Sequence, residues 1–363
     1  MPYTICQLPE YPVTEDLWTR LGAESRPIVV YGMGNGADKL FDRLESLGIT
    51  VSDIFASDGF VRGHSFRGMR VKSLSEIEAE YSDFVILLSF ASNRPEVVDM
   101  LAELDGRHEM YIPDMPVAGM DEYFDRDFYN AHYGEILHAY DSLADEKSRA
   151  CFASIVRFKL TGRLGYLEEC WSTVDELYSL IGDRSSMIDA GAYNGDTIRQ
   201  AESFMPSLEK VVAIEPDRKN FKRLMKYVDS QNSLSIQAIN AAAHSSDGEG
   251  AFAVSGNRNS TAAATASFKH SDEAVSLIPV DSIEFAPDYI KYDVEGGELD
   301  ALIGSCEAIA RHRPALLVSL YHRSRDLFSL VNFISEQFPF YRLYLRRLRC
   351  LPAWEIDLIC VEG

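Results

Sequence analysis

Short apolar runs alternate with longer amphipathic stretches in the first third of the chain. Over residues 27–118, the runs PIVVYG, DFVILLSF and EMYIP are separated by stretches with helical spacing such as ADKLFDRLESLG. Strands that alternate with helices predict a parallel sheet whose faces are covered. We therefore expect a small doubly wound α/β domain here, preceded by a loosely structured N-terminal arm over residues 1–26.

The pattern changes over residues 119–180 and then returns. Aromatic and charged residues at helical spacing, with no strand-like run, predict a connector of two or three helices that covers one edge of the next sheet. Over residues 181–363 the alternation resumes with SMIDAG, KVVAIEP, LSIQAINAAA, YIKYDV and ALLVSLY. The segment DGEGAFAVSGNRNSTAAATASF, between the third and fourth of these, predicts an inserted hairpin and a mobile loop beside the site.

The last two apolar runs, FYRLYLRRLR and EIDLICV, are joined only by CLPAW. A connection this short cannot hold a crossover helix, so the two strands must form an antiparallel hairpin. Five parallel strands closed by such a hairpin match the layout of class I methyltransferases, whereas an ordinary dinucleotide-binding sheet ends on a parallel strand. The predicted fold class is therefore α/β, with a Rossmann-like class I methyltransferase sheet preceded by a smaller parallel α/β domain.

Composition narrows the possible partners. The chain has 363 residues and a formal net charge of −21, which argues against nucleic acid because phosphate binding depends on clustered Lys and Arg. The one basic run, residues 342–349, is expected in a strand and leaves an anionic substrate open. There is no apolar segment of membrane-spanning length and no signal-peptide pattern. Scattered cysteines indicate reduced thiols, so we expect a cytoplasmic protein without a structural metal; a homo-oligomer remains open.

Two glycine-rich turns follow apolar runs and differ in charge. In MIDAGAYNGD, Asp189 precedes Gly191 and Gly195, whereas IVVYGMGNGA has Gly32 and Gly34 with no acid. A helix N-terminus favours a pyrophosphate, and a neighbouring carboxylate opposes it. S-adenosylmethionine has no phosphate and carries a sulfonium and an ammonium group, so an acid at this turn suits it. The first loop fits G-x-G-x-x-A, and we interpret it as an inherited nucleotide fold that need not hold a cofactor.

Further side chains complete the predicted cofactor site. Glu215 ends the next strand, 24 residues after Gly191, where an acid accepts hydrogen bonds from both ribose hydroxyls. Asn240, at the end of the third strand, is either a partner of the adenine edge or a turn former. The predicted cofactor-binding residues are Asp189, Gly191, Ala192, Tyr193, Asn194, Gly195, Glu215, Pro216, Asn240, Ala241 and Asp293.

The run YIKYDVEGGEL carries charges where a central strand is normally apolar. Lys291, Asp293 and Glu295 occupy alternate positions and so start on one face. Buried charges are costly unless they pair or meet a ligand. The sequence is compatible with a structural lysine–carboxylate network, with the place where methyl donor and acceptor meet, or with both.

These motifs together resemble the FkbM-type family of S-adenosylmethionine-dependent methyltransferases. The resemblance covers about residues 185–360 and rests on IKYDVEGGEL, with DAGAYNGDT before it and SLYHRSRDL after it. It implies methyl transfer to a hydroxyl oxygen, often of a sugar or another small hydroxylated metabolite. The closing hairpin has Arg347 where the family pattern predicts a histidine. The first domain resembles small nucleotide-binding domains of sugar-modifying enzymes.

Loss of a proton from an alcohol calls for a base near the acceptor. His322, just past ALLVSLY, and Glu295 are both candidates, with Asp293 beside them as a third catalytic residue. A packing role for His322 is equally compatible with the sequence. Asp293 and Glu295 offer two ligands for Mg²⁺, but no third is visible. Two other functions stay open: an NAD(P)-dependent nucleotide-sugar enzyme that uses the Gly32 loop, and a cofactor-binding scaffold without turnover.

Overall fold

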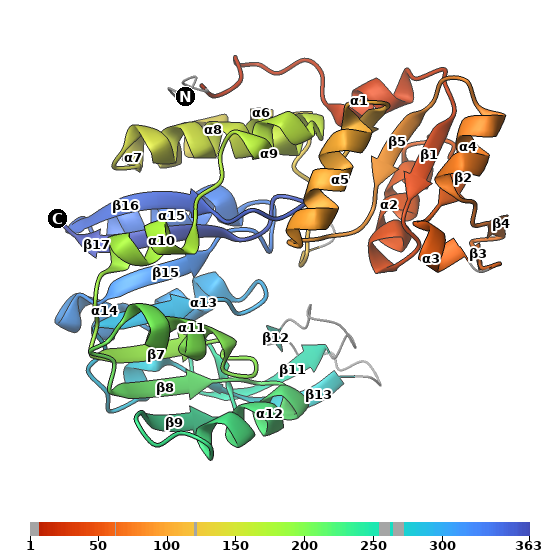
Figure 1. The fold of residues 1–363 in the computed structure, drawn as a ribbon. Helices are drawn as coiled ribbons and strands as arrows, with labels where there is room; N and C mark the ends of the chain where they lie inside the picture. The colour runs from red at the N-terminus through yellow and green to blue at the C-terminus, as the bar shows by residue number, and fades with distance from the viewer. Residues whose placement is uncertain (1–6, 62, 120–121, 254–261, 264–271) are drawn as a thin grey trace.

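The fold is that of a computed structural model, which describes residues 7–61, 63–119, 122–253, 262–263 and 272–363. Two main sheets, a parallel one in the N-terminal part and a mixed one in the C-terminal part, are bridged by helices (Figure 1). No helix in the described part of the chain is long and apolar enough to cross a bilayer. The segment limits predicted at residues 26, 118 and 180 stay a prediction.

The N-terminal sheet has four parallel strands in the order β2-β1-β5-β6. Its two central strands, β1 and β5, are buried throughout, as expected for strands covered by helices on both faces. A short helix, α3, and a small hairpin, β3–β4, were not predicted. The elements are β1 (Ile28–Tyr31), α2 (Asn35–Ser46), β2 (Asp53–Phe55), α3 (Asp58–Val61), β3 (Ser65–Phe66), β4 (Met69–Arg70), α4 (Leu74–Glu80), β5 (Val85–Leu88), α5 (Pro95–Asp105) and β6 (Glu109–Tyr111).

The predicted N-terminal arm is more ordered than expected. Helix α1 (Leu17–Gly22) begins at Asp16, whose carboxylate accepts a hydrogen bond from the amide of Thr19. The apolar face of α1, including Trp18, is buried. The N-cap and three closely spaced apolar residues are therefore sufficient for a docked helical turn.

The connector contains more helices than the two or three predicted. Between residues 126 and 181 the described chain has five helices. His132 ends α6 and starts α7, and Gly162, in the left-handed conformation (φ 65°), ends α8. These breaks were missed because the periodic pattern continues across them. The helices are α6 (Arg126–Ala131), α7 (Tyr133–Ser142), α8 (Glu146–Thr161), α9 (Leu164–Glu168) and α10 (Val174–Ile181).

The C-terminal sheet has seven strands in the order β16-β17-β15-β14-β7-β8-β9. The five strands from β15 to β9 in that order are parallel, and β17 runs antiparallel to both β15 and β16. The predicted fold class and terminal hairpin are thus confirmed. The strands are β7 (Ser186–Ala190), β8 (Lys210–Ile214), β9 (Ser235–Ile239), β14 (Tyr289–Tyr292), β15 (Ala315–Ser319), β16 (Tyr341–Arg347) and β17 (Ile356–Glu362).

Successive residues along a strand of the C-terminal sheet pack into different hydrophobic cores, one on each face of the sheet. Met187 and Tyr289 pack with α10, α11 and α12, whereas the next residues, Ile188 and Ile290, pack with the helices of the opposite face. This alternation follows from the two-residue period of a strand. The helices are α11 (Asp196–Phe204), α12 (Arg218–Val228), α13 (Glu298–Ile303), α14 (Cys306–His312) and α15 (Asp326–Gln337), with the 3₁₀ turn η1 (Val280–Ser282).

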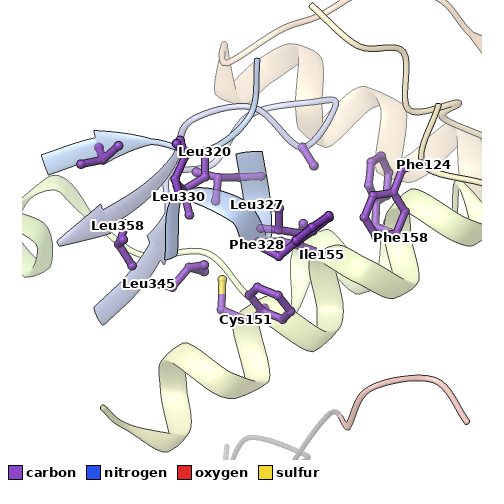
Figure 2. Close-up of a cluster of buried hydrophobic side chains, with 14 of the residues drawn as sticks. Phe124, Cys151, Ile155, Phe158, Leu320, Leu327, Phe328, Leu330, Leu345 and Leu358 are labelled. Atoms are coloured by element: carbon purple, nitrogen blue, oxygen red, sulfur yellow. The ribbon is translucent and has the colours of Figure 1, made fainter. Parts of the chain in front are cut away.

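The largest core joins the connector to the end of the chain. Figure 2 shows side chains of α8, including Ile155 and Phe158, facing residues of α15 such as Phe328 and of the closing strands such as Leu345 and Leu358. The amide of Leu345 also donates to the Ser148 hydroxyl on α8. As predicted, the connector covers this end of the C-terminal sheet.

The predicted inserted hairpin is confirmed in its described part. The strands β11 (Gly248–Ala253) and β13 (Asp272–Ile278) pair antiparallel, β12 (Ala262–Ala263) pairs with β11, and β10 (Ala242–Ala243) pairs with β13. The predicted mobile loop falls on residues 254–261 and 264–271, which lie outside the described residues.

Candidate functional site

A cavity of about 640 Å³ lies at the carboxyl ends of β7, β8 and β14. This is the edge at which open α/β sheets bind ligands, and the volume lies within the range of small-molecule sites. Its walls also include residues from the β5–α5 loop, from the segment between α9 and α10, and from the β16–β17 turn (residues 348–355). The site therefore combines the C-terminal sheet with parts distant in sequence.

The buried charges on β14 pair with the end of β7. Lys291 and Asp189 are direct neighbours on adjacent parallel strands, so their side chains share a face. Lys291 Nζ lies 3.4 Å from Asp189 Oδ1 and 3.4 Å from Asp293 Oδ2. Burial raises the pKa of Asp189, and Lys291 opposes the rise. Burial opposes the charge of Lys291, but the two carboxylates outweigh it and raise its pKa. The predicted lysine–carboxylate network is therefore present.

Two glycines of the second loop are required by close contacts. A Cβ on Gly191 (φ 90°) would lie 1.9 Å from the carbonyl oxygen of Asp293, and one on Gly195 (φ 83°) would lie 2.4 Å from the Tyr227 ring. Side chains are strained at positive φ and there is no room for them here. Gly191 thus lets the β7 turn approach the β14 turn, and Gly195 lets α11 start against α12.

Glu215 is held by backbone amides at the edge of the cavity. Its two carboxylate oxygens accept hydrogen bonds from the amides of Tyr193 and Asp217, each at 2.8 Å. Burial raises the pKa of Glu215 to about 7, although these amides oppose the rise. Asn240 Nδ2 donates to the carbonyls of Glu215 and Pro216 at 2.8 and 3.1 Å. Asn240 therefore braces the β8 turn, and its predicted contact with the adenine edge stays a prediction.

Glu295 lies in a tight turn and faces the cavity. Its backbone is left-handed (φ 56°), and Gly296 follows at φ 96°. Non-glycine residues in this region store strain and are concentrated at functional sites. Glu298, at the start of α13, stabilises the turn by accepting from the amides of Val294 and Gly296 at 2.9 and 3.3 Å. Burial raises the pKa of Glu295 to about 7, and nearby His322 opposes the rise.

His322 lies behind the cavity wall rather than on it. Its side chain is buried and is not among the described residues that line the cavity. Nδ1 lies 3.0 Å from Glu298 Oε1, and Nε2 lies 3.4 Å from Asp293 Oδ1 and 3.5 Å from Glu295 Oε2. Burial alone would lower the pKa of His322, but the carboxylates, Glu298 first, raise it to about 10. At neutral pH the imidazole is therefore a buried cation between acids.

The described residues that could together hold a metal ion differ from the predicted Mg²⁺ pair, because Glu298 and His322 join Asp293 in place of Glu295. Oxygens of Asp293 and Glu298 and a nitrogen of His322 lie within 4.8 Å of one another, a spacing that a metal ion can bridge. Both ring nitrogens, however, face carboxylates, so the ring itself occupies the space between them. We interpret the cluster as an ion-pair network centred on the imidazolium.

The predicted site residues separate into two groups. Those that line the cavity are Gly191, Tyr193, Glu215, Pro216, Asp293 and Glu295. Those that are not among its described lining are Asp189, Ala192, Asn194, Gly195, Asn240, Ala241 and His322. Residues of the second group stabilise the turn after β7. The amide of Ala192 donates a hydrogen bond to the carbonyl of Ile214, and the Arg199 guanidinium donates one to Asn194 Oδ1 at 2.6 Å.

Several residues from outside the strands of the C-terminal sheet also line the cavity, and three of them mark the separate segments that contribute. They are Asn93 from the β5–α5 loop, Trp171 from the segment before α10, and Arg349 from the β16–β17 turn. The basic run does reach the cavity through Arg349, but Arg347 is fully buried and donates to the carbonyls of Leu167 and Cys350. The basic run in the sequence therefore pointed to Arg349, whereas no sequence pattern pointed to Asn93 or Trp171.

Two glycines of the first glycine loop, Gly32 and Gly36, are packed against protein, whereas Gly34 faces open space. A Cβ on Gly32 would lie 2.6 Å from Ser89 Oγ, and one on Gly36 would lie 2.1 Å from the Ser89 carbonyl oxygen. These glycines allow α2 to start close to the end of β5. Their presence is thus explained by helix–strand packing without a ligand.

The cavity is acidic. Among the described lining residues, six carboxylates stand against the two cations Lys291 and Arg349. Such a lining favours a cationic guest and opposes a pyrophosphate. The carboxylates are Asp196, Glu215, Asp217, Asp293, Glu295 and Glu355. The strand order, the closing antiparallel strand and this acidic edge together define a class I methyltransferase-type fold.

Comparisons with known proteins agree with this class. Residues 189–350 match the family model described as the methyltransferase FkbM domain, which confirms the resemblance seen in the sequence. An FkbM methyltransferase structure from Methylobacillus flagellatus KT aligns with 98% of this chain and 94% of its own length, at 23% identity and a TM-score of 0.70. The shared fold thus includes the N-terminal sheet. No curated protein matches the sequence significantly.

Two other solved structures align with about half of the chain. A Streptococcus mutans structure described as a methyltransferase in complex with SAH covers 53% of this chain and 98% of its own, at 10% identity and a TM-score of 0.36. A precorrin-6y C5,15-methyltransferase from Geobacter metallireducens GS-15 covers 52% of this chain and 88% of its own, at 12% identity and a TM-score of 0.33.

Proposed function

We propose that the protein is an S-adenosylmethionine-dependent O-methyltransferase that acts on a hydroxyl group of a carbohydrate or a related small acceptor. The observation that carries the proposal is the acidic cavity at the carboxyl edge of β7, β8 and β14. The match of residues 189–350 to a methyltransferase domain supports it.

The residues of the cavity fit the chemistry of the cofactor. S-adenosylmethionine supplies a methyl group activated by a positively charged sulfur. Gly191 lets the β7 turn come within contact of Asp293, and a side chain there would collide with that backbone. Glu215 faces the cavity at the position predicted for the ribose hydroxyls, with its carboxylate already oriented by two amides. Asp293, whose pKa Lys291 and His322 lower against the effect of burial, offers a fixed negative charge.

Glu295 is the base in this proposal, and His322 is a positioning residue. Glu295 lines the cavity, and its pKa of about 7 suits proton transfer near neutral pH. His322 is buried behind the wall and already protonated at neutral pH, so it has no free lone pair to accept a proton. The structure thus favours Glu295 over His322 among the predicted candidates.

The reaction follows from these positions. The acceptor oxygen forms a bond to the methyl carbon while the carbon–sulfur bond breaks, and the hydroxyl proton moves to Glu295. The products are a methyl ether and the neutral thioether S-adenosylhomocysteine. The protein must align the acceptor oxygen, the methyl carbon and the sulfur, and it must accept one proton from the hydroxyl group. His322 and Glu298 hold the Glu295 turn so that its carboxylate stays near the acceptor.

Calorimetric titration tests the cofactor assignment. S-adenosylhomocysteine should bind the purified protein with one site per chain, and NADPH should not. Incubation with S-adenosylmethionine and a glycan fraction should then add the mass of one methylene unit to the acceptor. Binding of NADPH without binding of S-adenosylhomocysteine would overturn the proposal.

A further inference from the structure

Three segments that are far apart in sequence, and that are joined by backbone hydrogen bonds, form one wall of the cavity. Ser92 and Leu351 exchange two backbone hydrogen bonds of 2.8 and 2.9 Å, which attach the β5–α5 loop to the β16–β17 turn. The amide of Ser172 donates to the carbonyl of Arg347 at 2.7 Å, which attaches the segment before α10 to the same hairpin. Figure 1 shows the β16–β17 turn reaching α5.

These attachments place three side chains on the wall. Asn93 and Trp171 are next to the anchored residues Ser92 and Ser172, Arg349 lies between the anchored residues Arg347 and Leu351, and all three line the cavity. Trp171 is 42% exposed, so part of its indole is accessible in the cavity. Asn93 is exposed, and its amide forms no hydrogen bond among the described residues. An exposed indole and an exposed side-chain amide that line one cavity suit a polar ligand with an apolar face.

Arg349 supports Trp171 and carries little free charge. Its guanidinium carbon lies 5.9 Å from the centre of the Trp171 ring. Its Nη2 lies 2.9 Å from Asp99 Oδ1 and 2.9 Å from Glu168 Oε2. Two carboxylates thus balance one cation, and the rest of the cavity is acidic. An anionic acceptor, such as a sugar phosphate or a nucleotide sugar, would find no unpaired positive charge among the described residues of these three segments that line the cavity.

We propose that Trp171 and Asn93, supported by Arg349, form the acceptor subsite, and that its ligand is an uncharged saccharide. The inference rests on the proposed function, because the acceptor must enter beside the methyl donor. A pyranose ring has an apolar face of C–H groups that stacks on an indole, and its hydroxyls pair with an amide. The N-terminal sheet then has a role that needs no nucleotide: its β5–α5 loop supplies Asn93 to the acceptor.

The test uses the full chain saturated with S-adenosylhomocysteine and two kinds of probe. Maltose and methyl α-glucopyranoside are neutral, whereas glucose 1-phosphate and glucuronate are anionic. Binding is measured by calorimetry and by tryptophan fluorescence. We expect the neutral probes to bind and the anionic probes to bind at least about tenfold more weakly. Trp171→Ala and Asn93→Ala should each weaken binding of the neutral probes by about tenfold, and Trp171→Phe should retain most of it.

Matched control variants show whether a loss of saccharide binding is specific to Trp171 and Asn93 or follows from the loss of any exposed side chain of the same kind. Leu47→Ala removes another exposed apolar side chain, and Asn232→Ala removes another exposed amide; neither should change saccharide binding. Affinity for S-adenosylhomocysteine should stay within about twofold in every variant. Equal saccharide binding by wild type, Trp171→Ala and Asn93→Ala, tighter binding of the anionic probes, or no binding of any saccharide would each overturn the inference. Failure of the wild type to bind S-adenosylhomocysteine would instead overturn the proposed function.

Discussion

Lys291 and Asp189 lie opposite each other on neighbouring parallel strands, with Lys291 Nζ 3.4 Å from Asp189 Oδ1. Both are buried, and neither oxygen of Asp189 has a well-aligned hydrogen bond among the described residues. The charge of Asp189 is thus balanced mainly by attraction to Lys291. A carboxylate held in this way next to the cavity contributes to the electric field of the site, and its predicted role in cofactor binding stays a prediction.

Removal of Lys291 should destabilise the fold. Lys291→Met leaves Asp189 buried without its cation, and loss of one partner of a buried pair costs about 3 kcal/mol or more. The double variant Asp189→Asn/Lys291→Met should recover part of this loss. Urea denaturation followed by circular dichroism measures the free energy of unfolding. Lys210→Met, at the exposed start of β8, is the control. An unchanged free energy for Lys291→Met would contradict the pairing.

Glu215 should contribute to cofactor affinity. Glu215→Ala removes the acceptor predicted for the ribose hydroxyls and should weaken binding of S-adenosylhomocysteine by more than about tenfold, with the fold retained. Calorimetry measures the affinity. Glu209→Ala changes an exposed acid just before the same strand and should have no effect. If both variants bind as the wild type does, Glu215 is not part of the cofactor site.

Turnover should depend on the ionisation of Glu295. Its pKa is raised to about 7 by burial, and only the deprotonated form accepts a proton. The value of kcat/KM should therefore rise with pH up to about 7 and then level off. Glu295→Gln should lower kcat by about a hundredfold or more while affinity for S-adenosylhomocysteine holds. Glu307→Gln, at an exposed acid of α14, serves as the control. A pH profile of Glu295→Gln identical to that of the wild type would remove Glu295 from the mechanism.

His322 should stabilise the fold in a pH-dependent way. Its folded-state pKa of about 10 lies above the ordinary value of 6.5, so its charge contributes fully below pH 6.5 and the contribution is lost as pH rises towards 10. The difference in unfolding free energy between the wild type and His322→Gln should shrink across this range. Denaturation at pH 6.5, 8 and 10 measures it. A constant difference would mean that the imidazole is neutral in the folded protein.

Local patterns were sufficient for most of the fold. The apolar runs predicted the strands of both sheets, and the short connection after Arg347 predicted the antiparallel hairpin. The helices of the connector were undercounted because the amphipathic period continues through His132, where α6 gives way to α7. Strand ends also located Glu215 and Glu295 beside the cavity, since the carboxyl ends of parallel strands meet at one edge.

The sequence by itself determined which segments form strands, and with them the acids at the edge of the C-terminal sheet, because the two-residue period and strand ends are local properties. Only the tertiary structure decided that His322 lies behind the wall, that Glu298 orients it, and that Asn93 and Trp171 line the same cavity. These facts depend on burial and on contacts between residues far apart in the chain. Local periodicity does not encode which distant surfaces pack together, and a pKa depends on the neighbours that this packing provides.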